Sequence, residues 1–216
     1  MEGQAMNGKK LMNAAEIISK AGEQIEALVE ILNEKLIDAL TDEKQKIRAK
    51  ECTDEGVNSA GDWMFKSYFW DIALLRGKSK KPYAHVAIQI VLYDEEEVQI
   101  QGWEPSIYIM YATGEGEFEL ESFCFRFSKL LDAECHLDGD RLWRWEEEAE
   151  EDDSWMFSIP LVKMNCEEDL VQQIVEPVKK LIAGNTPHDA FPSDSVAFRF
   201  AVGNDDKLSI LVEDKP

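Results

Sequence analysis

Four glutamates alternate with other residues along one short segment of the chain, at Glu115, Glu117, Glu119 and Glu121. In a β-strand these carboxylates share one face at intervals of about 6.7 Å, because a strand rises about 3.3 Å per residue. Evenly spaced negative charges on a rigid element resemble the phosphate repeat of a nucleic acid. A row of charges also protects an edge strand from aggregation. This acidic row therefore predicts either a surface that binds a partner or a protected sheet edge.

The densest charge lies between residues 137 and 154, where nine acids stand against Arg141 and Arg144. Carboxylates this close repel one another, so we expect a solvated loop. Oxygen ligands for Mg²⁺ or Ca²⁺ are plentiful, but the spacing of a calcium-binding EF-hand loop is absent. We predict that this acidic run contributes, with the acidic row, to the contact with a basic partner through Glu146, Glu147, Glu148, Glu150, Glu151, Asp152 and Asp153.

The charge of the whole chain limits its partners. There are 44 acidic and 23 basic residues, a formal net charge of −21. This balance opposes direct binding to nucleic acid or to an anionic membrane, since both depend on Lys and Arg. It favours a basic protein partner, such as a nucleic-acid-binding protein, although solubility alone also explains an acidic chain.

Catalytic motifs are absent from the sequence. The three histidines lack metal-binding spacing, and no CxxC pair, phosphate-binding loop or nucleophile elbow occurs. Asp194, Glu213 and Lys215 would meet in a terminal hairpin, an arrangement that resembles a magnesium-dependent nuclease centre. A nuclease also needs a basic substrate channel, which this chain lacks. We therefore expect a protein that is not an enzyme, with no metal and no cofactor.

Large aromatic residues offer a second function of a different class. Trp63, Trp70, His85, Trp103 and Tyr108 fall in or beside expected strands. They predict either an ordinary aromatic core or a pocket for a small molecule or substrate.

The first forty residues predict one long helix. Apolar residues recur at spacings of three and four from Leu11 to Leu36. Small residues in the first half of this stripe, such as Ala21 and Gly22, permit another element to approach closely. The helix either packs on its own domain or assembles the protein as a structural subunit, a homo-oligomer in which the contacts are Leu11, Ile18, Ile25, Leu28 and Leu32.

Beyond the long helix the pattern predicts an α+β fold. Residues 41–50 resemble a second short helix, and residues 52–61 have the composition of a hinge. The chain then divides into a helical arm, residues 1–51, and a domain, residues 62–216, unless the whole is a single domain. Short connections between the later strands predict an antiparallel sheet of about seven or eight strands. The expected strands cover residues 62–75, 85–93, 98–102, 105–113, 118–127, 142–145 and 155–164.

The C-terminal third predicts one helix and one hairpin. Acidic residues at 167–169 begin an apolar helical stripe that ends at Gly184, and Pro177 inside it predicts a kink in a helix packed on the sheet. Residues 196–202 and 208–212 predict a terminal β-hairpin. No apolar leader and no stretch of about 20 apolar residues occurs, so we expect a cytoplasmic protein that does not bind membranes.

Overall fold

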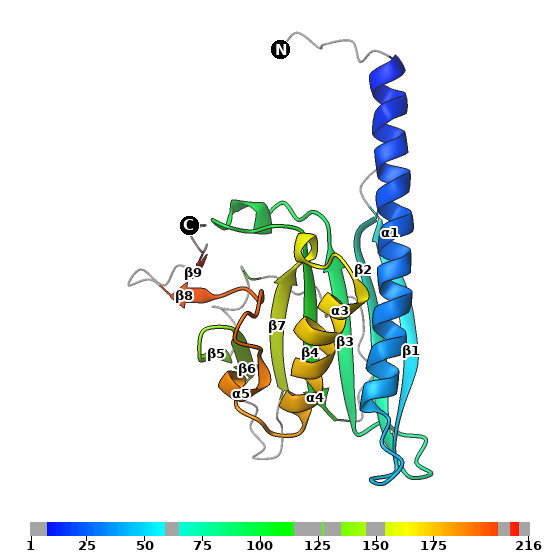
Figure 1. The fold of residues 1–216 in the computed structure, drawn as a ribbon, viewed down its shortest axis with the longest axis vertical. Helices are drawn as coiled ribbons and strands as arrows, with labels where there is room; N and C mark the ends of the chain where they lie inside the picture. The colour runs from blue at the N-terminus through cyan, green and yellow to red at the C-terminus, as the bar shows by residue number, and fades with distance from the viewer. Residues whose placement is uncertain are drawn as a thin grey trace.

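A computed structural model describes residues 8–58, 65–114, 127, 135–145, 154–202 and 208–211 of the chain. It consists of a long helix, an antiparallel sheet, a helical segment on that sheet and a terminal hairpin, as the sequence predicts (Figure 1). The helix α1 spans Gly8–Leu40. The strands of the main sheet are β1 (Ile47–Asn58), β2 (Phe65–Arg76), β3 (Ala84–Val91), β4 (Ser106–Thr113), β5 (Cys135–Asp138), β6 (Leu142–Trp145) and β7 (Ser154–Pro160).

The seven strands lie in the order β1-β2-β3-β4-β7-β6-β5, and every adjacent pair is antiparallel. The first four strands follow one another directly, as short connections require. The last three return toward β4, so that β7 pairs with β4 and β5 forms the far edge. The sheet is therefore two meanders joined at its centre.

The predicted C-terminal helix consists of three consecutive pieces, α3 (Glu167–Leu170), η4 (Val171–Val175) and α4 (Glu176–Ile182). The middle piece is a π-helical turn, and it ends just before Pro177, near the start of α4. Proline has no N–H group to donate to the carbonyl four residues earlier, and a wider turn relieves this mismatch. Gly184 then ends the helix with a φ of 83°. None of the described helices is long and apolar enough to cross a membrane.

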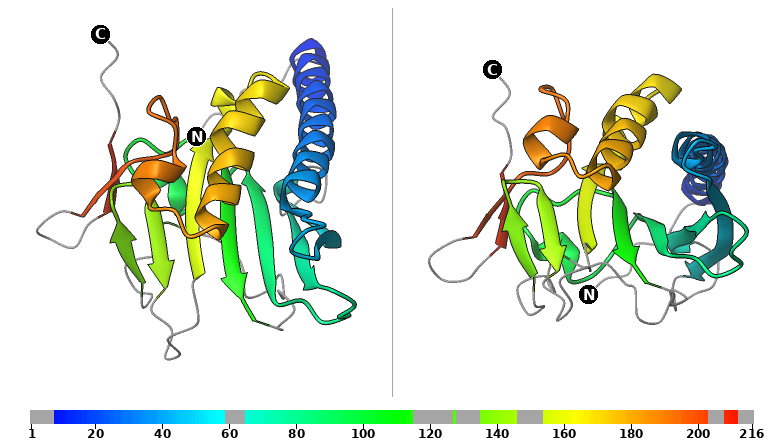
Figure 2. Two further views of the ribbon diagram at one scale, coloured as in Figure 1. Left: turned by 60° about the horizontal axis from the view of Figure 1, so that its bottom comes forward. Right: turned by 90° about the horizontal axis from the view of Figure 1, so that it is seen from below.

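All of these helices cover the same face of the sheet, which we call the helical face (Figure 2). Alternate residues of the central strands point to it, including Trp70, Ile88 and Phe157, all fully buried. Leu32 and Leu36 of α1 are fully buried in the same cluster. The second half of α1 is thus part of the core of the sheet, as the period of its leucines predicts.

The opposite face of the sheet is also buried. Its core contains Phe69, Tyr108 and Trp143, and it is covered by Phe127 and by the hairpin of β8 (Phe200–Val202) and β9 (Leu208–Ile210). Every residue of β3 is buried, because both of its faces are covered. This explains why the sequence of β3 is nearly all apolar instead of alternating.

Short segments differ from the sequence prediction. The strand predicted at 155–164 ends at Pro160, and Leu161–Lys163 form the 3-10 helix η3. Two further differences arise at aspartates. Residues 41–50 do not form a helix, because the Asp42 carboxylate accepts hydrogen bonds from the backbone N–H groups of Lys44 and Gln45 and closes a tight turn. A strand predicted at residues 98–102 is instead the 3-10 helix η1 (Glu97–Gln99). There, the Asp94 carboxylate accepts hydrogen bonds from the backbone N–H groups of Glu96 and Glu97. In both cases an aspartate side chain hydrogen-bonds nearby backbone and favours a turn.

The segment 52–58, for which the sequence suggests a hinge, belongs to β1 and pairs with β2. Residues 59–61, and residues 118–126 of the strand predicted at 118–127, lie outside the described part of the chain. β1 is an edge strand with solvent-exposed positions such as Glu51 and Cys52, which gives it a polar composition similar to that of a loop. The division into an arm and a domain stays a prediction.

We expect the Leu36→Ala substitution to reduce the free energy of unfolding by about 2–5 kcal/mol, because it opens a cavity under α1. The control is Val162→Ala, at a side chain that is 61% exposed, where the change should stay within about 0.5 kcal/mol. Urea unfolding followed by circular dichroism measures both variants. Equal effects of the two substitutions would mean that α1 does not belong to the cooperative core.

Candidate interaction groove

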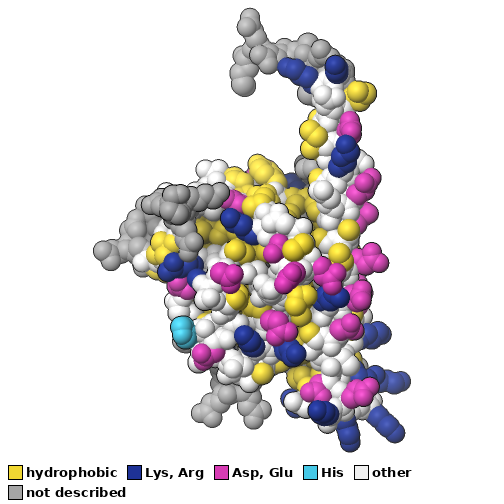
Figure 3. All heavy atoms as spheres, viewed as in Figure 1, with side chains coloured by type: hydrophobic (Ala, Val, Ile, Leu, Met, Phe, Trp, Pro, Cys, Tyr) yellow, Lys and Arg dark blue, Asp and Glu magenta, His cyan; other side chains and the backbone are white. Residues whose placement is uncertain are grey.

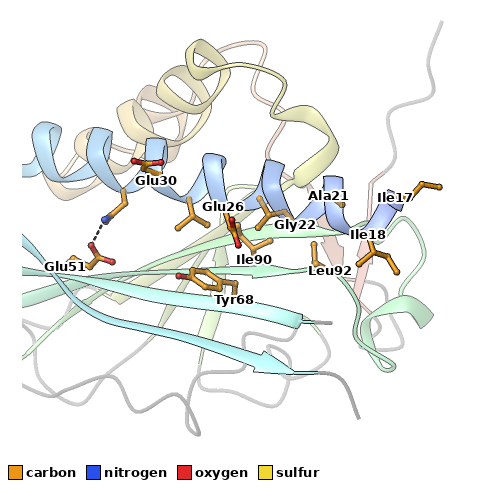
Figure 4. A pocket seen from close by; sticks show the side chains of 13 residues that line it. Ile17, Ile18, Ala21, Gly22, Glu26, Glu30, Glu51, Tyr68, Ile90 and Leu92 are labelled. Atoms are coloured by element: carbon orange, nitrogen blue, oxygen red, sulfur yellow. Dashed lines mark hydrogen bonds between the residues drawn. The ribbon is translucent and has the colours of Figure 1, made fainter. Parts of the chain in front are cut away.

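A groove of about 630 Å³ lies between the first half of α1 and the strands β1–β3 (Figure 4). Its helical side is formed by the stripe Ile18, Ala21, Gly22, Ile25 and Val29. Its sheet side is formed by Tyr68, Ile90 and Leu92, whose side chains point toward the underside of the helix. We call this site the α1 groove.

The groove exists because α1 changes its contacts along its length. Leu32 and Leu36 are fully buried against the sheet, while Ile18, Gly22 and Ile25 are only half-buried. A Cβ atom added at Gly22 would meet no atom within 4 Å. The small residues that the sequence suggests as a close-packing site therefore face open space within this chain.

Carboxylates supply the charges around this apolar groove. Glu26 and Glu30 come from α1, and Glu51 comes from β1. Asn33 donates a hydrogen bond from Nδ2 to Oε2 of Glu51 over 2.7 Å, which connects the helix to the edge strand. Among the residues described as lining the groove, none is a lysine or an arginine. The α1 groove therefore combines an apolar interior with negative charge at its rim.

Two acids of the rim, Glu26 and Glu30, belong to a longer stripe on α1. Glu23, Glu26, Glu30, Glu34 and Asp38 follow one another at spacings of three or four and share one side of the helix. The sequence contains this signal, which runs along the same helix as the apolar stripe but on another side of it. Figure 3 shows acidic side chains along this part of α1 and over the neighbouring helical segment.

Lys35 lies among acidic side chains on this side of the molecule. Its Nζ lies 2.7 Å from Oε1 of Glu167 at the start of α3. The hydrogen bond to Glu167 and the charge of that carboxylate, with smaller contributions from Glu34 and Asp38, raise the pKa of Lys35 above its ordinary value. The one lysine in the second half of α1 is thus paired with α3.

The structure separates the residues predicted for self-association. Leu32 is fully buried within its own chain, so it cannot contact a second copy in this fold. Leu28 is half-buried against the same core, and Leu11 lies in the projecting part of α1. Ile18 and Ile25 line the α1 groove. The acidic row and the acidic run, residues 115–121 and 146–153, lie outside the described part of the chain.

The aromatic residues of the alternative function do not gather at one place. Trp70 is buried on the helical face, and Tyr108 is buried on the opposite face. His85 is buried on the opposite face too, where its Nδ1 lies 2.8 Å from Oδ2 of Asp71. Trp103 donates a hydrogen bond to the Tyr108 hydroxyl over 3.2 Å. Of the five residues, the structure brings Trp103 and Tyr108 into direct contact, and Trp63 lies outside its described part.

Asp194 lines a second hollow, of about 710 Å³, near the terminal hairpin. Arg141 and Arg199 also line it, and both approach Asp140, at N–O distances of 3.4 and 2.6 Å. Glu213 and Lys215 lie outside the described residues, so the nuclease-like arrangement remains a prediction from sequence. Within the part of the chain that the structure describes, no three His, Cys, Asp or Glu residues form a cluster suited to a metal ion.

Comparisons of this chain with known protein families, with curated proteins and with solved structures each find no match.

A buried hydrogen-bonded chain next to β4 yields a pH-dependent prediction. The Tyr108 hydroxyl donates to Oε2 of the fully buried Glu97 over 3.3 Å. Burial, followed by the charge of Glu97, raises the pKa of Tyr108 well above its ordinary value. The unfolded chain ionises this tyrosine near pH 10, whereas the folded chain keeps it protonated. Unfolding therefore releases a proton above pH 10, and stability falls as the pH rises.

We expect the wild type to lose about 1.4 kcal/mol more per pH unit above pH 10 than the Tyr108→Phe variant. Urea unfolding at pH values from about 8 to about 12, which bracket the ordinary tyrosine pKa of about 10, measures the two slopes. The same substitution at the exposed Tyr93 is the control. Parallel slopes for the wild type and Tyr108→Phe would contradict the burial of this hydroxyl.

Proposed function

We propose that this protein is a non-enzymatic interaction protein that binds a basic partner. The observation that carries the proposal is the α1 groove, an apolar channel whose described lining contains carboxylates and no cations. An amphipathic segment would place its apolar side against Ile18, Ile25 and Ile90. Its lysines or arginines would then meet Glu26, Glu30 and Glu51.

Helix-in-groove complexes show which interactions supply the free energy of such binding. Burial of apolar side chains supplies most of the affinity, and the charges at the rim select basic over acidic segments. Exposed charge pairs contribute only about 0.2–1 kcal/mol each. The net charge of −21 adds long-range attraction, which raises the rate of encounter with a basic protein.

Charge at the rim gives a direct test. The probe is a synthetic amphipathic helix of about five turns with leucines on one side and lysines on the other, and its affinity is measured by fluorescence anisotropy. We expect the variant Glu26→Gln/Glu30→Gln/Glu51→Gln to bind this peptide about tenfold more weakly than the wild type. Glutamine at position 51 keeps an acceptor for Asn33, so the fold should be unaffected.

The matched control removes the same charge elsewhere. Glu43, Glu95 and Glu104 are exposed and do not line the groove, so their replacement by Gln should leave the affinity nearly unchanged. A second peptide, with glutamates in place of lysines, should not bind. The proposal is wrong if both triple variants bind like the wild type, or if the acidic peptide binds equally well.

The acidic row suggests a narrower form of this function, in which the partner is a nucleic-acid-binding protein. Its support is the sequence alone, through the spacing of about 6.7 Å expected between alternate glutamates of a strand. Such a partner would contact the row with the same lysines and arginines that it uses to contact a phosphate backbone.

We expect reversal of Glu115, Glu117, Glu119 and Glu121 to Lys to abolish the capture of basic proteins from a lysate while the fold, checked by circular dichroism, stays intact. Moderate salt should abolish capture by the wild type, because it screens exposed charges. The control reverses four exposed acids outside the row, the run and the groove, Glu43, Glu95, Glu104 and Glu168, which changes the net charge equally. Retained capture by the first variant would exclude nucleic-acid mimicry by the row.

A further inference from the structure

The second hollow, of about 710 Å³, lies at the end of the sheet where β4 begins and β7 ends, since Ser106 pairs with Pro160 (Figure 1). The loop before β4, the helix η3, the segment 193–199 and the strand β9 all contribute residues to its lining. Its volume is in the range of ordinary small-molecule sites. We call it the arginine hollow, because Arg141 and Arg199 both line it.

The backbone around the two arginines holds them in place. Arg141 follows Asp140 in the turn between β5 and β6. The backbone oxygen of Asp140 accepts a hydrogen bond from the N–H group of Phe200 over 2.8 Å. The backbone oxygen of Arg199 accepts one from the N–H group of Leu211 over 2.7 Å. Main-chain contacts therefore fix this part of the hollow, so that a ligand has little chain to order when it binds.

One carboxylate serves both arginines. Arg199 donates a hydrogen bond from Nε to Oδ2 of Asp140 over 2.6 Å, whereas Nε of Arg141 lies 3.4 Å from the other oxygen, Oδ1. The longer contact is an ion pair only, and Nε of Arg141 has no hydrogen-bond acceptor among the described residues. The Arg141 side chain is 18% exposed, while that of Arg199 is 39% exposed. Two guanidinium groups against one carboxylate leave an excess positive charge, and the less solvated of the two has the poorer partner.

The rest of the lining combines apolar surface with solvated polar groups. The apolar surface comes from Trp103, Phe198 and Ile210. The acids of the lining, Glu104 and Asp194, are exposed, and neither of these two described residues lies within ion-pair distance of Arg141. Water screens exposed charges, so the two acids do not compensate a guanidinium group that is mostly buried.

We propose that the arginine hollow binds a small organic anion, in which a carboxylate or a phosphate monoester is attached to an apolar body. The oxyanion would accept hydrogen bonds from the terminal Nη groups of Arg141, because both head groups match the planar fork of a guanidinium. Lys163, which also lines the hollow, would add a second cation from the exposed rim. The apolar body would pack against Phe198 and Ile210. This inference goes beyond the proposed function, since the site and the class of ligand are different.

The net charge of −21 does not exclude such a ligand. At physiological ionic strength exposed charges more than about 8 Å apart are largely screened, so the groups in contact with the anion decide its affinity. A purely structural role for Arg141 would also be expected to include a hydrogen bond to the turn. Arg199 makes that hydrogen bond to Asp140, and Arg141 does not.

The experiment titrates the full chain by isothermal titration calorimetry at constant ionic strength. The probes are phenyl phosphate, benzoate, inorganic phosphate and the neutral compound benzamide. We expect the wild type to bind an organic anion, and the tighter of phenyl phosphate and benzoate identifies the head group. Arg141→Gln should weaken this binding at least about tenfold, because a charge-assisted contact is lost. Arg141→Lys keeps the charge without the fork, so its affinity should lie between those of the wild type and Arg141→Gln.

The matched control is Arg144→Gln. It removes the same charged group from β6, but Arg144 donates to Asp138 and does not line the hollow, so the affinity should equal that of the wild type. Circular dichroism checks that each variant is folded. Lys163→Glu changes an exposed side chain that the fold does not need, and it should weaken binding by about threefold. This second variant tests the site independently of the turn that contains Arg141.

Each negative outcome removes a definite part of the inference. A wild type that binds neither organic anion overturns it, and so does wild-type affinity in both Arg141→Gln and Lys163→Glu. Benzamide that binds as tightly as the anions would overturn the contact with an oxyanion. Inorganic phosphate that binds as tightly as phenyl phosphate would overturn the role of the apolar walls. None of these results bears on the α1 groove, because no residue described as lining one site lines the other.

Discussion

The packing of Leu32 and Leu36 against the helical face of the sheet is the contact on which the arrangement of the molecule depends. It fixes the second half of α1 beside the strands. A helix of 33 residues is about 50 Å long, whereas β3, with eight residues, spans about 26 Å. Once the C-terminal half of the helix is anchored, the N-terminal part must extend past the central strands, since each helical residue adds about 1.5 Å. The projecting segment and the groove beneath it are consequences of this difference in length.

The two faces of the sheet differ in chemistry, and the buried polar residues lie on only one of them. The helical face is apolar in every central strand. The buried polar residues of these strands lie on the opposite face, where Asp71 is paired with His85 and Glu97 receives the Tyr108 hydroxyl. Buried polar groups need partners, and these contacts supply them. A histidine beside a carboxylate is also typical of active sites, but here the Asp71 and His85 side chains are only 2% and 5% exposed. A substrate has no direct access to this pair.

Much of the fold could be predicted from the sequence, because its main elements are periodic. The leucines of α1, the β-branched strands and the acidic start of α3 are local signals that the packing preserves. The prediction was wrong where an aspartate side chain accepts hydrogen bonds from nearby backbone N–H groups, as at Asp42 and Asp94. It also missed a strand of only four residues, β5. The α1 groove was not predictable, because it depends on where the helix leaves the sheet. Its rim brings Glu51 close to residues of α1 about 20 positions earlier in the chain. The two come together only because β1 pairs with β2 and so lies beside the helix.

A net charge of −21 sets a condition on any assembly of this chain with itself. Two such molecules repel each other at long range, so an interface must place opposite charges in contact. At physiological ionic strength charges are screened beyond about 8 Å, which weakens the general repulsion far more than it weakens pairs within a few ångströms. Local order of charge therefore matters more than its total. Within one chain such order is visible at Lys20 and Lys35, whose Nζ atoms each lie 2.7 Å from a glutamate carboxylate, Glu16 and Glu167, although the chain as a whole is acidic.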